Sequence, residues 1–449
     1  MQQQSAPNGA SETAPSSGRD HGAIAAASAT QGILDADSQG ALRRLALARQ
    51  GLQFREQIIT TIGDDAPTSA ERVSAVVAHL GALGIDTTAV VMRAHHHSLW
   101  NRLRGYRVQD LDAAIAERRV FEYWSHAAAY LPMRDYRFAQ VKMRAMREGK
   151  DRWIRSKDER LMRRIKKRIA SDGPLTLREL ESNRTSVSAR IGSTLGWWDW
   201  KPSRDALLQL FLQGELMVVA GHGQNKRYDL RERVLPDNID TRFPTTDEYA
   251  DYLIDMQLRT AGAMTEACCS YLRNGKELRR AIHRSLQERL RAGRLDSFER
   301  AGVTWYLDGE RERPAKSQQH TIRILSPFDN LIVQRDRLQG VFGFDYVLEN
   351  HVPEAKRRYG YFALPVLVND EFVARLDCKA HRNSRVFEIR GLHWEPGAVA
   401  PELLGELGAE LAEFARFNGC RRLLLDLPSE PEYGALKAEL AERLNGYEF

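Results

Sequence analysis

Residues 207–228 read LLQLFLQGELMVVAGHGQNKRY, and residues 286–307 read LQERLRAGRLDSFERAGVTWYL. In both stretches a helix-forming run ends at a glycine, a strand-like run follows, a turn reverses the chain, and a second strand carries a tyrosine. The glycine and the tyrosine are 14 residues apart in the first stretch and 13 in the second. A helix followed by a β-hairpin is the ending of a winged-helix module. An ordinary α+β packing unit shares this pattern, but its recurrence favours a tandem array of winged-helix units.

The chain around these repeats is long enough for several domains. It has 449 residues, about three times the ~150 residues of an average domain. Residues 1–40 hold few large apolar side chains, so we expect a disordered N-terminal extension there. Thr68 and Glu71 have the spacing of a capping box ahead of a helix, and Gly81 is placed to end that helix. Further helical stretches through Leu99 predict a helix-turn-helix unit.

The C-terminal third changes character. Short strand-like stretches follow one another from residue 318, and they predict a small β-barrel completed by a helix, one more strand and an acidic tail. These stretches are residues 321–325, 331–333, 361–368, 372–376 and 386–389, then a helix over 401–417 and a strand over 423–425. The fold class is therefore α+β: tandem winged-helix motifs followed by a barrel. The expected domains are residues 1–40 (extension), 41–155, 156–238 and 239–317 (three winged-helix units), and 318–449 (barrel, helix and tail).

Charge is concentrated in one part of the chain. The formal net charge is +6, but residues 131–170 alone hold fifteen Lys or Arg against five Asp or Glu, whereas residues 401–449 hold ten acids and five bases. A localised basic segment is the electrostatic footprint of a nucleic-acid-binding protein, although a charge run is equally often a solvated helix face. No apolar run is long enough for a membrane span, and we expect no secretory signal. The four cysteines form neither a CxxC pair nor the regular spacing of a disulfide framework. We expect a cytoplasmic protein.

The densest polar cluster lies at residues 84–100. Asp86 sits between Ile85 and an apolar run, so its carboxylate is either partly desolvated with a functional role or a helix N-cap before residues 87–92. His95, His96 and His97 are consecutive, so they point in three directions on a helix and do not form a metal site. With Arg93 and Arg102 they suit phosphate and base contacts, and packing of one histidine against a neighbouring helix is the alternative.

Several classes of chemistry have no signature in the chain. It has no Gly-rich phosphate loop, no nucleophile elbow and no Cys/His zinc motif. These absences make nucleotide hydrolysis a less favoured function. Trp197, Trp198 and Trp200 are more often core residues, although one of them could stack on a base.

Five separated strings resemble one known family in the same order along the chain. They are residues 85–87 (IDT), 93–100 (RAHHHSLW), 325–331 (LSPFDNL), 344–346 (FDY) and 356–361 (KRRYGY). Together they resemble the bacterial winged-helix DNA glycosylases of the YcaQ (AlkX) and AlkZ type, over roughly residues 41–425. The family architecture is three winged-helix motifs and a C-terminal β-barrel around a DNA channel, which agrees with the repeat pattern.

The resemblance implies hydrolysis of the N-glycosidic bond of N7-alkylated guanine, including the unhooking of interstrand crosslinks, without metal or cofactor. Family members carry Gln, an apolar residue, and then Asp or Gln; the last two positions fall on Ile85 and Asp86, as in the YcaQ type. Asp86 is thus the expected catalytic group. Gly84 departs from the family Gln, and loss of such a preorganised group commonly costs ~10²-fold in rate. His79, Thr87, or one of His95 to His97 is a candidate substitute, a bulkier substrate is a second explanation, and low or absent activity is a third.

The expected partner is double-stranded DNA with an alkylated or crosslinked guanine, bound by a monomer. Because a crosslinked base cannot rotate freely out of a duplex, we expect a wide channel at Asp86 and not a sealed pocket. The alternative function is a non-catalytic winged-helix DNA-binding protein, a regulator or lesion sensor, in which Gly84 marks a degraded motif. Besides the cluster at residues 93–102, the predicted phosphate contacts are the basic segment from Arg134 to Arg168 including Arg137, then Lys226, Arg227, Arg335, Arg337, Lys379 and Arg382.

Overall fold

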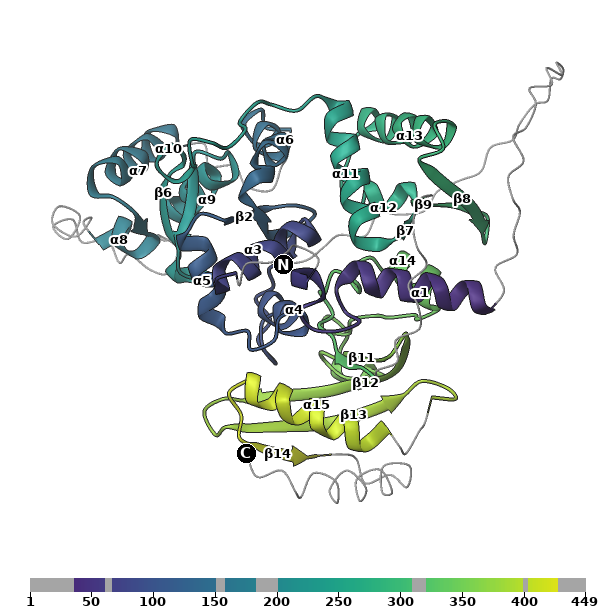
Figure 1. Cartoon of the computed structure of the whole chain (residues 1–449). Helices are drawn as coiled ribbons and strands as arrows, with labels where there is room; N and C mark the ends of the chain where they lie inside the picture. Colours follow the sequence, from purple (N-terminus) through teal and green to yellow (C-terminus); the bar gives the residue numbers. More distant parts are fainter. Residues whose placement is uncertain are drawn as a thin grey trace, which may run out of the picture.

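The computed structural model describes residues 36–60, 67–150, 158–182, 201–308, 320–398 and 403–426. Three helical units, each with its own three-stranded sheet, lie above a fourth unit built on a five-stranded sheet (Figure 1). The expected extension over residues 1–40 falls almost wholly outside the described residues. The tryptophans near residue 200 and the tail after residue 426 also lie outside them.

The three helical units share one topology: helix, short strand, two helices, then a hairpin whose second strand pairs with the short strand. The pattern predicted from two stretches of sequence thus occurs three times. The first unit contains α3 (Ser69–Leu80), β1 (Leu83–Gly84), α4 (Ala94–Arg102), α5 (Val108–Ala116), β2 (Val120–Trp124) and β3 (Ala128–Pro132). The second contains α7 (Glu159–Asp172), β4 (Leu175–Thr176), α8 (Leu177–Ser182), α9 (Lys201–Leu212), β5 (Leu216–Ala220) and β6 (Arg227–Leu230). The third contains α11 (Thr246–Ala261), β7 (Ala263–Met264), α12 (Glu266–Cys269), α13 (Lys276–Arg291), β8 (Leu295–Arg300) and β9 (Val303–Asp308).

Local sequence explains where α3 begins and ends. The Thr68 side chain accepts a hydrogen bond from the Glu71 amide, and the Glu71 carboxylate accepts one from the Thr68 amide. At the other end Gly81 adopts φ 73°, a left-handed conformation that glycine adopts without strain. The capping box and the terminating glycine are both confirmed. The capping box fixes the start of α3, and Gly81 fixes its end two residues before β1, the strand that leads to Asp86.

The fourth unit is a curled, open sheet in the order β10-β11-β12-β13-β14. Its strands are β10 (Ile322–Ile324), β11 (Leu364–Val368), β12 (Glu371–His381), β13 (Val386–Trp394) and β14 (Arg422–Leu425). Neighbours are antiparallel except β14, which runs parallel to β13. Within the described ranges β10 and β14 are not paired to each other, so the expected small barrel is a half-barrel. Residues 331–333, predicted as a strand, form a turn instead.

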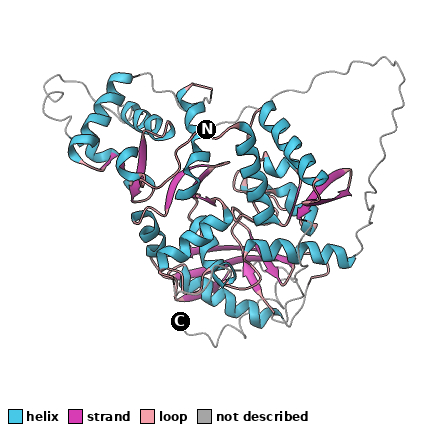
Figure 2. Cartoon of the chain, turned by 45° about the horizontal axis from the view of Figure 1, so that its top comes forward, coloured by secondary structure: helices cyan, strands magenta, loops and turns pink. Residues whose placement is uncertain are grey.

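Helices connect and cover these units. α15 (Leu403–Phe417) lies against the C-terminal sheet, where its apolar side chains share a core with the sheet and with the first unit (Figure 2). α1 (Ala36–Gln50) packs on α11 and on α14 (Arg335–Phe342), and so joins the third unit to the sheet. The shorter connections are α2 (Gln57–Thr60), α6 (Tyr136–Arg147) and α10 (Arg231–Val234).

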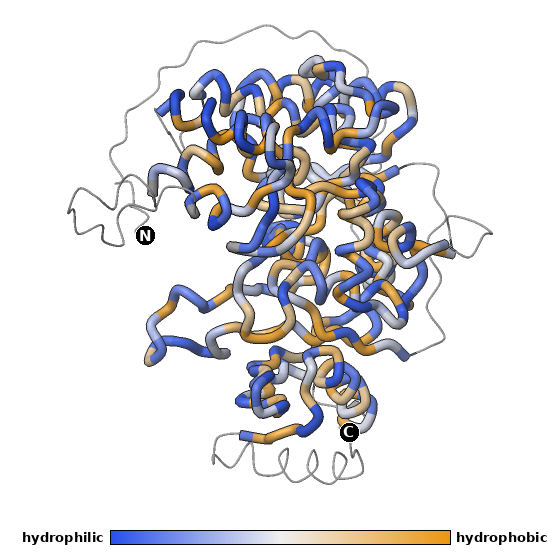
Figure 3. The backbone as a smooth tube through the Cα atoms, turned by 90° about the vertical axis from the view of Figure 1, so that its left-hand side faces the viewer, coloured by the Kyte–Doolittle hydropathy of each residue, from blue (hydrophilic) through white to orange (hydrophobic). Residues whose placement is uncertain are grey.

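Hydropathy follows this packing. Along the helices of the units apolar and polar stretches of the tube alternate, as expected for elements with one buried face (Figure 3). In the part of the chain that the structure describes, no helix is both long and apolar enough to cross a bilayer. The helices and sheets that the structure describes form a mixed α+β fold, as predicted.

Candidate active site and nucleic-acid interface

Asp86 lies in a segment that joins the first helical unit to the C-terminal sheet. The segment leaves β1 and runs to the start of α4; at its beginning Ile85 N–H donates to the carbonyl of Ala128, 2.8 Å away. At its other end Ala380 N–H of β12 donates to the carbonyl of Val90, 2.9 Å away. Residues 85–89 are extended or irregular and α4 begins only at Ala94. The interpretation of Asp86 as the N-cap of a helix over residues 87–92 is therefore wrong.

The Asp86 carboxylate is held in place but not enclosed. Its Oδ2 accepts a hydrogen bond from the Thr88 amide at 2.8 Å, a contact across two residues that fixes the side chain against its own backbone. The residue is half-buried, while Thr87 and Ala89 beside it are exposed. Among the described residues no partner is recorded for Oδ1. One carboxylate oxygen is thus anchored and the other is free to meet a ligand or a water molecule.

Gly84 stands beside empty space and not beside a substitute side chain. A Cβ atom added to it would have one neighbour within 4 Å, the main-chain carbonyl oxygen of Phe328 at 3.6 Å. Of the candidate substitutes for the family Gln, His79 bonds through Nε2 to the carbonyl of Arg49. Thr87 is exposed and next to Asp86.

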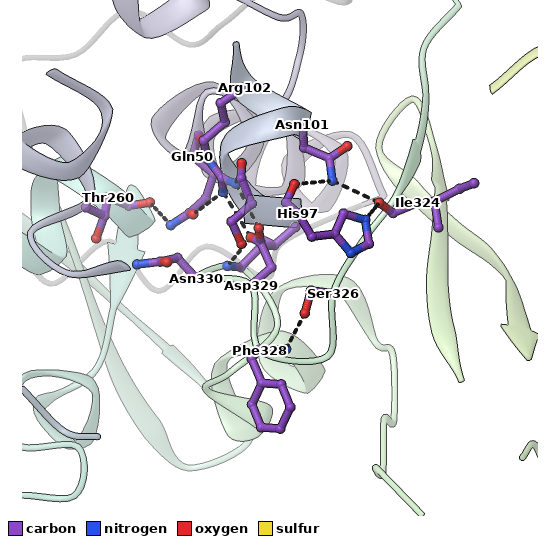
Figure 4. Close-up of polar contacts among 12 residues, drawn as sticks. Gln50, His97, Asn101, Arg102, Thr260, Ile324, Ser326, Phe328, Asp329 and Asn330 are labelled. Atoms are coloured by element: carbon purple, nitrogen blue, oxygen red, sulfur yellow. Dashed lines mark hydrogen bonds and ion pairs between the residues drawn. The ribbon is translucent and has the colours of Figure 1, made fainter. Parts of the chain in front are cut away.

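The loop that brings Phe328 to Gly84 is fixed by a buried ion pair (Figure 4). Arg102 Nη1 and Nη2 donate to the two oxygens of Asp329 at 2.7 and 2.9 Å, and both side chains have no exposed surface. Gln50 adds its carbonyl and side-chain oxygens to the same guanidinium. Burial alone raises the pKa of Asp329, but the charge and hydrogen bonds of Arg102 hold that pKa below its ordinary value. Arg102 is therefore a structural residue, and its predicted DNA contact is wrong.

The three histidines are buried inside the first unit. His97 Nε2 lies 2.8 Å from the carbonyl of Ile324, and His96 Nδ1 lies 2.7 Å from the hydroxyl of Tyr106. His95 is 1% exposed, and its ring nitrogens have no partner in the described structure. Burial lowers the pKa of His96 to about 3 and that of His97 to about 4, so these rings are neutral at neutral pH. The prediction that the three rings contact phosphate is wrong, because every residue of α4 is buried. Their role as substitutes for the family Gln stays a prediction.

These features agree with the comparisons with known proteins. Residues 77–417 match the profile of the family described as DNA glycosylase AlkZ-like. The chain belongs to this family. Among solved structures, the DNA glycosylase AlkZ of Streptomyces sahachiroi is similar over 86% of this chain and 99% of its own, with a TM-score of 0.54 and 18% identity. That likeness concerns the fold, and the family resemblance predicted from the five strings is confirmed.

Several cations predicted to hold phosphates are engaged elsewhere in this AlkZ-like chain. Arg337 is buried and donates to Gln257 and to the carbonyl of Asn330. Arg335 donates to the carbonyls of Ile332 and Pro327. Both guanidiniums support the turn after β10. Arg337 is buried, so its predicted phosphate contact is wrong; Arg335 is half-buried, and its phosphate contact stays a prediction.

Three further cations are paired with carboxylates. Arg137 pairs with Asp240 and Glu248, Lys226 with the buried Glu122, and Arg227 with Glu179. Each pair joins residues far apart in sequence, so no spacing rule could have revealed it. Their charges are already compensated, which weakens their attraction for phosphate without excluding it.

Four predicted cations remain accessible. Arg134 is exposed, and Lys379 is half-buried on β12. Arg382 is exposed and donates to the carbonyl of Ala89, in the segment that carries Asp86. Partial burial lowers the pKa of Arg382, and the nearby charge of Arg93 lowers it further. Arg382 thus lies against the segment that carries Asp86, and its charge interacts with that of Arg93 at the end of the same segment.

Proposed function

We propose that this chain is a monofunctional DNA glycosylase that hydrolyses the N-glycosidic bond of N7-alkylated guanine and unhooks interstrand crosslinks. The observation that carries the proposal is the Asp86 carboxylate: one oxygen is anchored by the Thr88 amide and the other is free, on an open segment flanked by Arg93 and Arg382. Membership of the AlkZ-like family supplies the reaction class.

The chemistry needs little beyond this carboxylate. Alkylation at N7 makes the base a cation, so the electron pair of the C1′–N9 bond can leave with it and neutralise it. The sugar then resembles an oxocarbenium ion, which a nearby anion stabilises. A water molecule adds its oxygen to C1′ and passes a proton to Asp86. No strand is cut, and the products are a free base and an abasic site.

The open surroundings of Asp86 favour a bulky or crosslinked lesion. Thr87 and Ala89, which follow it in the chain, are exposed, so this part of its own segment does not close over the carboxylate. A base that is still bonded to the opposite strand cannot enter a closed pocket. We therefore propose a wide channel at this position.

The repeated topology supports a DNA-binding scaffold. We propose that the three helical units are winged-helix modules, spanning about residues 41–155, 156–238 and 239–317, ahead of a C-terminal unit over 318–449. We expect the hairpins of these units, such as the one formed by β5 and β6, to contact the DNA backbone. The partner is double-stranded DNA, bound by a cytoplasmic monomer.

A single-turnover assay tests the proposal. A labelled duplex with one N7-methylguanine is incubated with wild type and with Asp86→Asn, and abasic sites are converted to strand breaks by alkali. Asn keeps an oxygen that can accept from Thr88 N–H but cannot take a proton or carry a charge. We expect base release by wild type and a loss of at least about 10²-fold in Asp86→Asn, with duplex affinity retained.

The control is Asp370→Asn, which removes a carboxylate of a half-buried ion pair with Arg44. Its rate should equal that of wild type. If wild type releases no base from any alkylated duplex but binds DNA, the non-catalytic alternative stands, and Gly84 marks the lost chemistry. Equal rates for wild type and Asp86→Asn would show that another group performs the reaction.

A further inference from the structure

The loop of residues 349–361, which precedes β11, is held in shape by the carboxylate of Glu349. The Glu349 carboxylate, 9% exposed, accepts hydrogen bonds from three successive amides: Arg358 at 2.9 and 3.1 Å, Tyr359 at 2.8 Å and Gly360 at 3.2 Å. Successive amides converging on one anion form a nest. Because Glu349 fills this nest, the loop has its shape before any ligand arrives.

The loop is also pressed against the sheet. Gly360 adopts φ +114°, and a Cβ at that position would lie 2.2 Å from Oδ2 of Asp377 on β12. The Arg375 guanidinium lies 4.1 Å from the ring centre of Tyr359, and on the outer side that of Arg358 lies 4.9 Å from it. The backbone and the aromatic ring beneath Arg358 are thus both fixed, so little freedom is lost when Arg358 binds a ligand.

Two cations on this loop have no counter-charge within the described residues. Lys356 and Arg358 are exposed, and within the described residues neither side chain forms a hydrogen bond or an ion pair with the protein. This distinguishes them from Lys226, Arg227 and Arg137, whose charges are compensated by carboxylates. The sequence showed the run only as part of a family string; the structure shows that it is an uncompensated positive surface on a rigid support.

This surface belongs to the same region of the molecule as Asp86. Phe362, which follows the loop, has its ring centre 6.1 Å from that of Phe328, and a Cβ atom on Gly84 would lie 3.6 Å from the carbonyl oxygen of Phe328. Two packed residues, Phe362 and Phe328, therefore connect the loop with the strand that leads to Asp86. A duplex lying across Asp86 would pass within reach of a neighbouring cationic loop.

We propose that Lys356 and Arg358 are phosphate contacts that hold the sugar-phosphate backbone of duplex DNA next to Asp86. The proposal rests on the proposed function in that it takes DNA as the partner. Its chemistry is charge complementarity: two uncompensated cations, one with a planar guanidinium fixed over an aromatic ring, match the oxygens of a phosphate backbone.

Salt dependence of binding to an undamaged duplex tests it, because each phosphate contact contributes about 0.9 to the slope of log K against log of salt concentration. Anisotropy of a labelled duplex is measured over a range of NaCl concentrations. Lys356→Ala and Arg358→Ala should each reduce the slope by about 0.9 and the double variant by about 1.8. Arg358→Lys keeps the charge and should keep the slope. The control Arg242→Ala removes an exposed cation already paired with Asp240, and should leave the slope unchanged.

The outcomes separate this inference from the proposed function. A double variant that unfolds at the temperature of wild type and keeps the full salt slope would overturn the inference, whatever happens to base release. A slope that falls equally for Arg242→Ala would also overturn it, because the effect would then be one of net charge. Wild type that binds no duplex at all would overturn the proposed function itself. Binding with the predicted slopes but without base release would leave the contact established and remove only the catalysis.

Discussion

Restoring the family residue at position 84 is the most informative change that the structure suggests. Gly84 is in β1, its φ lies outside the left-handed region, and a Cβ would meet a single atom at 3.6 Å, an ordinary van der Waals contact. Gly84→Gln should therefore fold. Because glycine is the most flexible residue in the unfolded chain, its replacement at an unstrained position should stabilise the fold by about 0.4–1 kcal/mol.

Gly84→Gln should change the rate of base release more than it changes the stability of the fold. A preorganised amide that orients the water or the sugar is worth about 10²–10³-fold in the rate constant, or about 2.7–4 kcal/mol. The Gln amide would enter the space in front of the Phe328 carbonyl, which can accept one of its N–H groups and orient the rest. Single-turnover release of N7-methylguanine should rise by at least about 10²-fold over wild type.

Gly84→Ala is the matched control. It tests the same backbone change without the amide, so it should show the gain in stability by urea unfolding and no gain in rate. The double variant Gly84→Gln with Asp86→Asn should be inactive. A destabilised Gly84→Gln variant would show that the space beside β1 is too small for the side chain. A rate of base release equal to that of Gly84→Ala would show that a group already present performs the role of the amide.

Two further predictions concern stability. Asp329→Asn leaves Arg102 buried without its counter-charge and should lower the free energy of unfolding by about 3–5 kcal/mol. Asp370→Asn, in a half-buried ion pair, should lower it by less than about 1 kcal/mol. Urea titration measures both values, and similar losses of stability for the two variants would disprove the structural role of the buried pair. His96, His97 and His126 have pKa values of about 3, 4 and 4 because burial disfavours their charged forms. The unfolded chain takes up protons below pH 6.5 and the folded chain does not, so the free energy of unfolding should fall as pH drops from 6.5 to 5, by about 1.6 kcal/mol for each ring. Equal free energies of unfolding in urea at the two pH values would contradict the assignment.

Local signals in the sequence predicted much of the fold. The capping box at Thr68 and the terminating Gly81 act within a few residues, so they could be recognised without tertiary information. The repeated helix and hairpin were predicted because each unit must bury its own apolar face, and that requirement leaves the same pattern each time. Barrel closure could not be predicted, because it depends on whether β10 and β14 meet, which no local pattern specifies.

The candidate site was predicted less evenly. Asp86 was singled out as a carboxylate within an apolar run, and the family resemblance implied its catalytic role; the structure places it on an open segment. The cations were predicted from charge alone, and their availability depends on distant partners: Arg102 meets Asp329 across 227 residues and Lys226 meets Glu122 across 104. Sequence spacing carries no information about such pairs. The exposed cations Lys356 and Arg358 were overlooked because only the fold shows that they lack a partner.

A structure of Asp86→Asn bound to a duplex with one N7-alkylguanine would show directly whether position 86 faces the reacting sugar. We expect the side chain at position 86 to lie within one water molecule of C1′ of the damaged nucleotide, with hydrogen-bond distances of about 2.6–3.2 Å on either side of that water. A damaged nucleotide bound elsewhere on the protein, with position 86 remote from its sugar, would rule out Asp86 as the catalytic group.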